Sequence, residues 1–189
     1  MLFSALPRSA RTGYPEEAMK FSTVIVGLGA RLFTWNRPLL EFWARHAKVI
    51  AHADTPWTPL RREPGACTVA LVTTAGVHLA SDAPFDMDDR RGDPSFREIP
   101  SDAPASRLVV THDYYDHRDA DRDVNVVFPV DRLRELAGSG EIGRAAPFHY
   151  SFMGHVTGPH VATLRDATSR EAARRLRGAG VDLVLLSPA

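Results

Sequence analysis

The chain has 189 residues, of which 44% are hydrophobic and 24% are charged. These are ordinary values for a globular domain, and a chain of this length can bury about 70% of the surface that it exposes when unfolded. Its 23 basic residues are balanced by 23 acidic residues, so no net field attracts it to nucleic acid or to an anionic membrane. We therefore expect neither partner.

The single cysteine, Cys67, excludes a disulfide framework within the chain, a CxxC redox pair and a zinc site built from several thiolates. This usage fits a reducing compartment. The longest apolar run, at 24–30, is far shorter than the roughly 20 residues that a membrane span requires. Because Glu16 and Glu17 interrupt the region where a secretory signal would lie, we predict a cytoplasmic protein.

Residues 1–52 are expected to form a helical extension, because early acidic residues follow a proline and an apolar stripe at helical spacing comes later. Pro38 should divide this extension into two shorter helices. Residues 53–66 contain three prolines and a glycine, which predicts an extended linker. The folded domain should therefore occupy 67–189.

Buried strands are expected in this domain wherever a short, β-branched apolar run ends in a turn. Helices are expected where apolar residues share one face and glycines follow, and the second of them begins with a capping-box pattern. Strands alternating with short helices are typical of a three-layer α/β sandwich with a mostly parallel sheet. The polar stretch at 81–106 is too long for a simple connection, which indicates a functional loop or a small insertion. The predicted strands are 68–74, 108–111, 148–153 and 181–186, and the predicted helices are 130–137 and 168–177.

Three polar clusters follow the first three predicted strands, at 73–78, 111–117 and 151–155. In α/β sheets, ligands bind beyond the carboxyl ends of the strands. We therefore expect the three clusters to converge on one pocket.

The second cluster can be read as a metal site, because His112 and His117 enclose two aspartates and imidazole and carboxylate ligate zinc or iron. Their spacing matches no strong metal signature. We favour the alternative, a solvated acidic loop with hydrogen-bonded histidines, and assign no metal.

Arg97 and Glu98 lie in the polar stretch and have two interpretations. A planar guanidinium suits a bidentate grip on a substrate carboxylate. Alternatively, the two side chains form an ion pair that pins the loop.

Four ordered segments resemble the selenoprotein B family of the glycine, sarcosine, betaine and D-proline reductases, and most closely its D-proline branch. The resemblance extends from about Trp57 to the end of the chain and implies an oxidoreductase that cleaves a carbon–nitrogen bond of a small amino acid or amine. The four segments are ALVTTAGVH at 70–78, GDPSFREIP at 92–100, NVVFPVDRLREL at 125–136 and PFHYSFMG at 147–154.

The resemblance also implies a nucleophile. In this family a selenocysteine, or a cysteine in its place, attacks the substrate and a neighbouring cysteine helps to recycle it, directly after the strand that corresponds to 181–186. We therefore expect the redox-active residue beyond Ala189, at a selenocysteine codon read as a stop. Cys67 lies at the wrong place in the chain to substitute for this nucleophile. The alternative interpretation is that the chain is a truncated, non-catalytic remnant.

Given this resemblance, His78 and His112 are the candidate catalytic residues, because imidazole titrates near neutral pH and can protonate a leaving amine. The expected partners are a small amino acid or amine, a partner reductase subunit, a dithiol donor and further copies of the chain. The alternatives are a non-catalytic binding or regulatory subunit and a metal-dependent hydrolase that uses His112, Asp116 and His117. The candidate substrate-binding residues are Thr74, Gly76, Arg97, Glu98, Asp116 and His117.

Overall fold

The computed structural model describes residues 37–46 and 58–189, which belong to two separate units. The first unit contributes helix α2 (Arg37–His46), which has a proline in its first turn, where no helical hydrogen bond is lost. The remainder of the predicted helical extension and the first part of the predicted linker lie outside the described residues.

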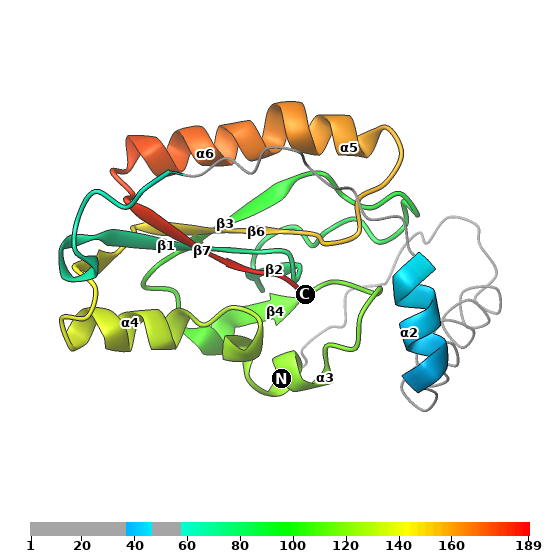
Figure 1. Ribbon diagram of the computed structural model, residues 1–189, viewed down its shortest axis with the longest axis horizontal. Helices are drawn as coiled ribbons and strands as arrows, with labels where there is room; N and C mark the ends of the chain where they lie inside the picture. Colours follow the sequence, from blue (N-terminus) through cyan, green and yellow to red (C-terminus); the bar gives the residue numbers. More distant parts are fainter. Residues whose placement is uncertain (1–36, 47–57) are drawn as a thin grey trace, which may run out of the picture. The chain divides into compact units, whose positions relative to one another are not determined.

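The second unit is an α/β domain built on a five-stranded sheet (Figure 1). Its central strand is β1, which pairs in parallel with β5, β6 and β7, while β3 runs antiparallel beside β6. Because β7 pairs with β1 along nearly its whole length, β5 and β6 share the other edge of β1. The strands of the sheet are β1 (Thr68–Thr73), β3 (Phe96–Pro100), β5 (Arg144–Ala145), β6 (Phe148–Phe152) and β7 (Leu183–Ser187).

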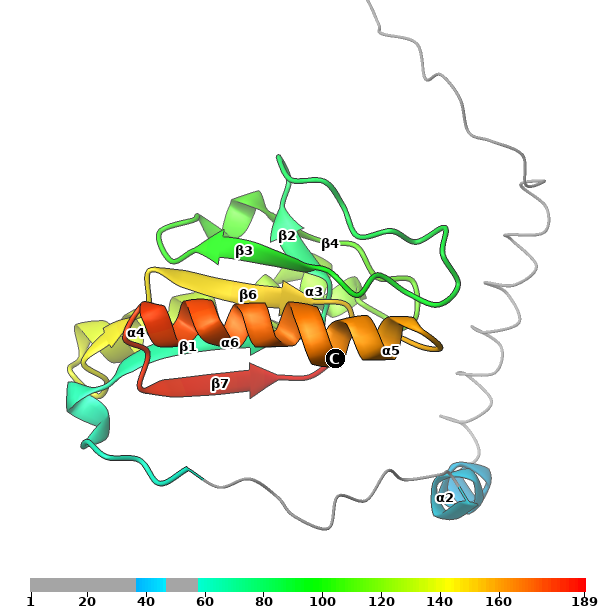
Figure 2. The same ribbon diagram turned by 90° about the horizontal axis from the view of Figure 1, so that it is seen from above.

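Helices cover both faces of this sheet. Helix α4 (Val130–Gly138) lies on one face, and α5 (His160–Thr163), the π-turn η4 (Leu164–Thr168) and α6 (Ser169–Gly178) run as one continuous helix along the other (Figure 1). Figure 2 shows α6 crossing above the sheet and β7 at its outer edge. The arrangement is the α/β fold with a mostly parallel sheet that the sequence predicts.

Two apolar clusters hold the three layers together. Alternate side chains of β1 face opposite sides of the sheet, so Val69 and Leu71 join the larger cluster with α4 and Val72 joins the smaller one with α6. Complete burial of one large aliphatic or aromatic side chain contributes roughly 1.5–3 kcal/mol. Other members of the two clusters are Ile99, Phe128, Val130 and Leu133 on the α4 side, and Tyr150, Phe152 and Ala172 on the α6 side.

The structure corrects three expectations. The polar stretch at 81–106 contains strand β3, whose sequence FREIP does not alternate polar and apolar residues and so gives no period-two strand signal. The run that begins at Leu108 forms β4 (Leu108–Val110), which pairs with β2 (Val77–Leu79) in a separate antiparallel ribbon and not in the main sheet. The capping box at Thr168 is absent, because Thr168 is itself helical and its hydroxyl donates to the carbonyl of Pro94.

Short elements complete the described part of the domain. Within that part, no helix has both the length and the apolar character needed to cross a bilayer. The short elements are η1 (Pro64–Ala66), η2 (Ala105–Arg107), α3 (Arg118–Arg122) and η3 (Val124–Val126).

Candidate functional site at the carboxyl edge of the sheet

The three polar clusters predicted from the sequence meet at one edge of the sheet. Ala75, which follows β1, bridges Met153, which follows β6, and the backbone N–H of Gly154 lies 3.2 Å from Nε2 of His112. The three clusters meet as predicted, although His112 arrives from the β2–β4 ribbon, and a pocket at their meeting point stays a prediction. We call this region the carboxyl-edge site, and it comprises Thr74, His112, Tyr114, Tyr115, Gly154 and His155.

Gly76 allows the ribbon to approach the sheet. Its φ is +69°, and a Cβ there would lie 2.4 Å from the carbonyl oxygen of Thr111 and 3.1 Å from Cβ of His112. Its N–H donates to Phe152 and its carbonyl accepts from Thr111, both at 2.9 Å. The backbone of Gly76 therefore positions His112 at the carboxyl-edge site.

His112 is only 3% exposed, and both of its ring nitrogens face backbone N–H groups. The N–H of Tyr114 lies 3.2 Å from Nδ1, and the N–H of Gly154 lies 3.2 Å from Nε2. A neutral imidazole has one acceptor nitrogen and an imidazolium has none. Burial lowers the pKa of His112, and the neighbouring His155 adds to the effect. This surrounding favours a neutral His112 over an imidazolium that protonates a leaving amine.

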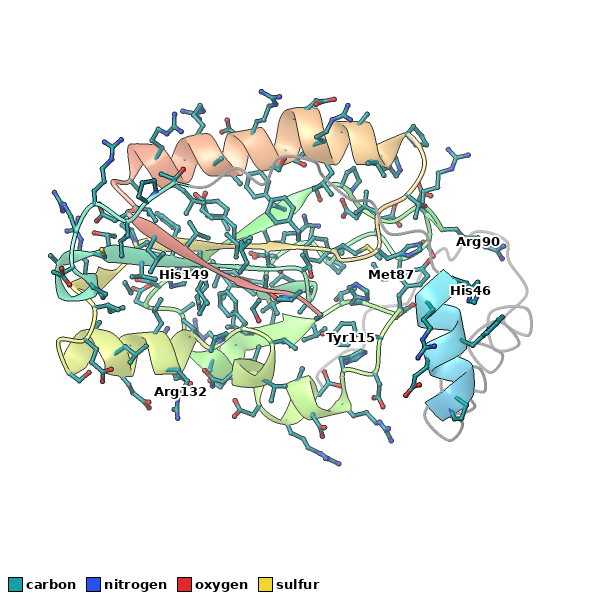
Figure 3. The ribbon with its side chains drawn as sticks, viewed as in Figure 1. His46, Met87, Arg90, Tyr115, Arg132 and His149 are labelled. Carbon is teal, nitrogen blue, oxygen red and sulfur yellow. The ribbon has the colours of Figure 1, made fainter. Side chains whose placement is uncertain are left out.

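Aromatic rings surround His112. The ring of Tyr114 stacks on His155 with 3.8 Å between centroids, and Tyr115 meets His112 edge-on at 4.8 Å. The hydroxyl of Tyr115 donates to the carbonyl of Ala75 at 3.1 Å, and burial raises the pKa of Tyr115 to about 12, with Asp121 adding to the shift. Tyr115 is therefore a protonated, anchoring residue. Figure 3 labels Tyr115, which lies near the edge of the sheet where the chain ends.

Four of these residues were not predicted from the sequence. Tyr114, Tyr115, Gly154 and His155 all lie inside the predicted clusters 111–117 and 151–155. Their position directly after a strand was the signal that could have identified them, since aromatic residues and glycines carry no distinctive chemistry by themselves.

His78 is buried away from His112, within the ribbon. Its Nδ1–H donates to the carbonyl of Leu79 at 2.8 Å, and its Nε2 accepts from the hydroxyl of Thr111 at 2.8 Å. The acceptor carbonyl fixes this tautomer. Both nitrogens are therefore used in joining β2 to β4, which favours a structural role for this candidate catalytic residue.

Arg97 and Glu98 point to different partners. The five N–H groups of Arg97 bind loop atoms, and its guanidinium lies 4.3 Å from the centroid of the Phe85 ring. Glu98 instead pairs with Arg175 of α6 at 2.9 Å. The structure thus contains no Arg97–Glu98 pair, and Arg97 pins the 81–95 loop through these acceptors: the carbonyls of Ala83, Pro84 and Phe96, the hydroxyl of Ser95 and the carboxylate of Asp93.

Asp116 and His117 lie on the loop before α3. Asp116 pairs with Arg118, which lowers the pKa of Asp116 to about 2, and Nδ1 of His117 lies 2.9 Å from the Asp121 carboxylate. Across residues 37–46 and 58–189, no group of three or more histidine, cysteine, aspartate or glutamate side chains is placed to hold a metal ion. The described residues therefore give a metal-dependent hydrolase no ligand set.

The last residues of the chain reach the carboxyl-edge site. The hydroxyl oxygen of Thr74 accepts from the N–H of Ala189 at 3.1 Å, and the N–H of Thr74 donates to Ser187 at 3.2 Å. A Cβ on Gly154 would lie 3.0 Å from the carbonyl oxygen of Ala189 and 3.3 Å from Nε2 of His112. The missing side chain at Gly154 thus lets the segment after β7 lie against His112.

The structure is an α/β domain with a candidate site at the carboxyl edge of a mostly parallel sheet. The model of the glycine/sarcosine/betaine reductase selenoprotein B family matches residues 62–189. The chain belongs to this family.

Two curated relatives have related names. The chain is 44% identical over 131 residues to the D-proline reductase subunit gamma of Acetoanaerobium sticklandii, covering 69% of this chain and 52% of that protein. It is 30% identical over 139 residues to the glycine reductase complex component B subunit gamma of Carboxydothermus hydrogenoformans, covering 70% of this chain and 30% of that protein. The chain therefore spans about half or less of these relatives. No solved structure matches it significantly.

Proposed function

We propose that this chain forms the substrate-presenting part of a reductase that cleaves a carbon–nitrogen bond in a small amino acid or amine of the D-proline, glycine, betaine or sarcosine type. Family membership and the 44% identity to a D-proline reductase subunit support this reaction class. The observation that carries the proposal is the arrival of the end of β7 beside Thr74, Gly154 and His112.

The nucleophile in this proposal is a selenocysteine or cysteine that follows β7 in the complete reductase. Such a residue attacks as the anion, which requires an accessible site with hydrogen-bond donors or positive charge. Cys67 does not fit this role, because it is fully buried at the amino end of β1, with Sγ 3.4 Å from the carbonyl of Glu63.

The overall reaction is a two-electron reduction. The C–N bond is replaced by a C–H bond and an N–H bond, and a dithiol supplies two electrons and two protons while it becomes a disulfide. Both relatives are named as subunits, which supports a partner subunit for this chain. In the proposed site, Thr74 and His112 face the reacting groups, while His78 and Arg97 hold the ribbon and the 81–95 loop in place.

Dithiol-dependent amine formation tests the proposal. Two proteins are incubated with D-proline, glycine, betaine or sarcosine: the 189-residue chain, and the same chain continued with the sequence encoded downstream. Only the continued protein should release product, and an alanine in place of its first selenocysteine or cysteine should abolish the activity. Turnover by the 189-residue chain, or no turnover of any substrate by the continued protein with its partner subunit, would contradict the proposal.

The DNA downstream of codon 189 tests the nucleophile separately. We expect an in-frame TGA codon followed by a continuation that contains cysteine. A different stop codon would refute this part of the proposal.

A further inference from the structure

We propose that β7 is an interior strand of the complete reductase, and that a further parallel strand from the polypeptide after Ala189 pairs with its open edge. The inference rests on the proposed function only for the existence of that continuation. The exposed surface of β7, its sequence and the topology of the sheet supply the rest.

Strand β7 is uncovered on one edge and on both faces. It pairs with β1 on one side and with no other strand in the described part of the chain. The register places Leu185 beside Leu71, on the face that α4 covers, and Leu186 beside Val72, on the face that α6 covers. Both β7 leucines are nevertheless exposed, Leu186 by 68%. The two helices therefore cover the sheet as far as β1 and leave β7 bare.

The sequence of β7 is that of an interior strand. Proteins protect a solvent-facing sheet edge with charged residues or proline, and β3, at the opposite edge of this sheet, contains Arg97, Glu98 and Pro100. Strand β7 reads LVLLS, with neither a charge nor a proline. A continuous apolar run of this kind is typical of a parallel strand that is buried on both faces.

The occupant that we infer for this edge is the rest of the same polypeptide. The match to the D-proline reductase subunit covers only 52% of that protein, so a reductase of that size has enough further chain for additional strands and helices. A second copy related by a twofold axis fits less well. It would pair the two β7 edges but bring no helix over them, because α4 and α6 leave β7 bare in each copy.

The handedness of crossovers predicts which face the next connection covers. From β6 the chain passes over the α6 face, crosses β1 and returns to the sheet at β7 (Figure 2). A strand outside β7 is reached by a further step in the same direction, so a right-handed connection again passes over the α6 face. This connection would bury Leu186.

The inferred topology also bears on the carboxyl-edge site. The chain that leaves β1 enters the β2–β4 ribbon, which packs with α4 on the opposite face from α6. Adjacent strands whose connections leave toward opposite faces form a crevice at their carboxyl ends, where α/β proteins bind ligands. In the continued protein this crevice would lie at Thr74 and Ala189.

Amide hydrogen exchange tests the strand pairing without enzyme activity. The carbonyl of Ser187 accepts from Thr74, so by alternation the amides of Val184 and Leu186 point away from β1. These two amides should exchange freely in the 189-residue chain. In the continued protein, made with a cysteine codon in place of the expected TGA, they should exchange at least about tenfold more slowly. The Leu185 amide, which points toward β1, is the internal control and should be protected in both proteins.

A charged substitution tests the covering of the α6 face. Leu186→Lys should leave the urea midpoint of the 189-residue chain nearly unchanged. It should lower the midpoint of the continued protein by about 1 M or more, because the new ammonium group would be buried without a partner. Val126→Lys is the matched control, since Val126 of η3 is 63% exposed, and it should change neither midpoint.

Three outcomes would overturn the inference. Free exchange of Val184 and Leu186 in the continued protein would exclude the added strand. Protection that rises with the concentration of the 189-residue chain would assign the edge to a second copy, and protection that requires the partner subunit would assign it to that subunit. A protected edge in a protein that fails the reductase assay would contradict the proposed function alone, whereas turnover by a protein with a freely exchanging edge would contradict this inference alone.

Discussion

Lowering the pH should destabilise this domain through one fully buried histidine, His149 of β6. Its exposed fraction is 0%, and its Nδ1 accepts the N–H of Leu71 on the central strand at 3.1 Å. Nε2 therefore carries the proton, and within the described chain this N–H has no hydrogen-bond partner. Figure 3 labels His149 in the interior of the sheet.

Burial lowers the pKa of His149 from 6.5 to about 4, with Arg134 adding to the shift. Between these two pKa values the unfolded chain binds a proton at His149 and the folded chain does not. The contribution of His149 to the free energy of unfolding is therefore fully present above pH 6.5 and is lost as the pH falls toward 4. One pKa unit corresponds to 1.36 kcal/mol, so the loss is about 2 kcal/mol at pH 5 and about 3 kcal/mol once the pH is below both values.

Urea unfolding of the 189-residue chain at pH 7, 6 and 5 measures this loss. His149→Asn is the matched variant, because its side-chain oxygen can replace Nδ1 as the acceptor for Leu71 while the titrating group is removed. We expect a lower free energy of unfolding for this variant at pH 7 and a flatter pH dependence. Equal pH dependence of the two proteins from pH 7 to 5, or an NMR titration of His149 near 6.5, would refute the reasoning.

Two further substitutions test how the site is held. Gly76→Ala should lower the free energy of unfolding by about 2 kcal/mol or more and weaken the His112–Gly154 contact, because φ is +69° and the new Cβ would lie 2.4 Å from the Thr111 oxygen. Urea unfolding measures the first effect, and the Gly154 amide resonance reports the second. An unchanged free energy of unfolding and an unchanged resonance would contradict this prediction. Arg97→Met should increase proteolytic cleavage within the 81–95 loop at least severalfold, because five hydrogen bonds are lost. Arg97→Lys should be intermediate, and equal cleavage of all three proteins would refute the pinning role.

The fold was predictable from the sequence where one short segment carries its own signal. Strands β1, β6 and β7 and helix α4 each have an apolar run or stripe that needs no knowledge of the partner. Strand β3 was missed because its polar residues are stabilised by distant groups, Arg97 by the 81–95 loop and Glu98 by Arg175. The three-residue strands of the β2–β4 ribbon are too short for their apolar residues to indicate which sheet they join.

The candidate site was predictable in position but not in detail. The rule that ligands lie beyond the carboxyl ends of strands located Thr74, His112 and Gly154 in one region. The separate duties of His78 and His112 follow from contacts with Thr111 and Gly154, which lie 33 and 42 residues away. Such long-range pairings are set by the tertiary fold, so residue types and spacing did not distinguish the two histidines.

The central claim is that the carboxyl-edge site around His112 is where the reduction takes place, and kcat/KM measured on the continued protein tests it most directly. With D-proline, or whichever of the four substrates is turned over, His112→Phe should reduce kcat/KM by about 100-fold or more, the typical effect of losing one donor to a developing charge. Arg132→Met, whose parent side chain pairs with Glu135 on the surface of α4, should stay within about twofold of the parent protein. Equal activity of the two variants would contradict the claim.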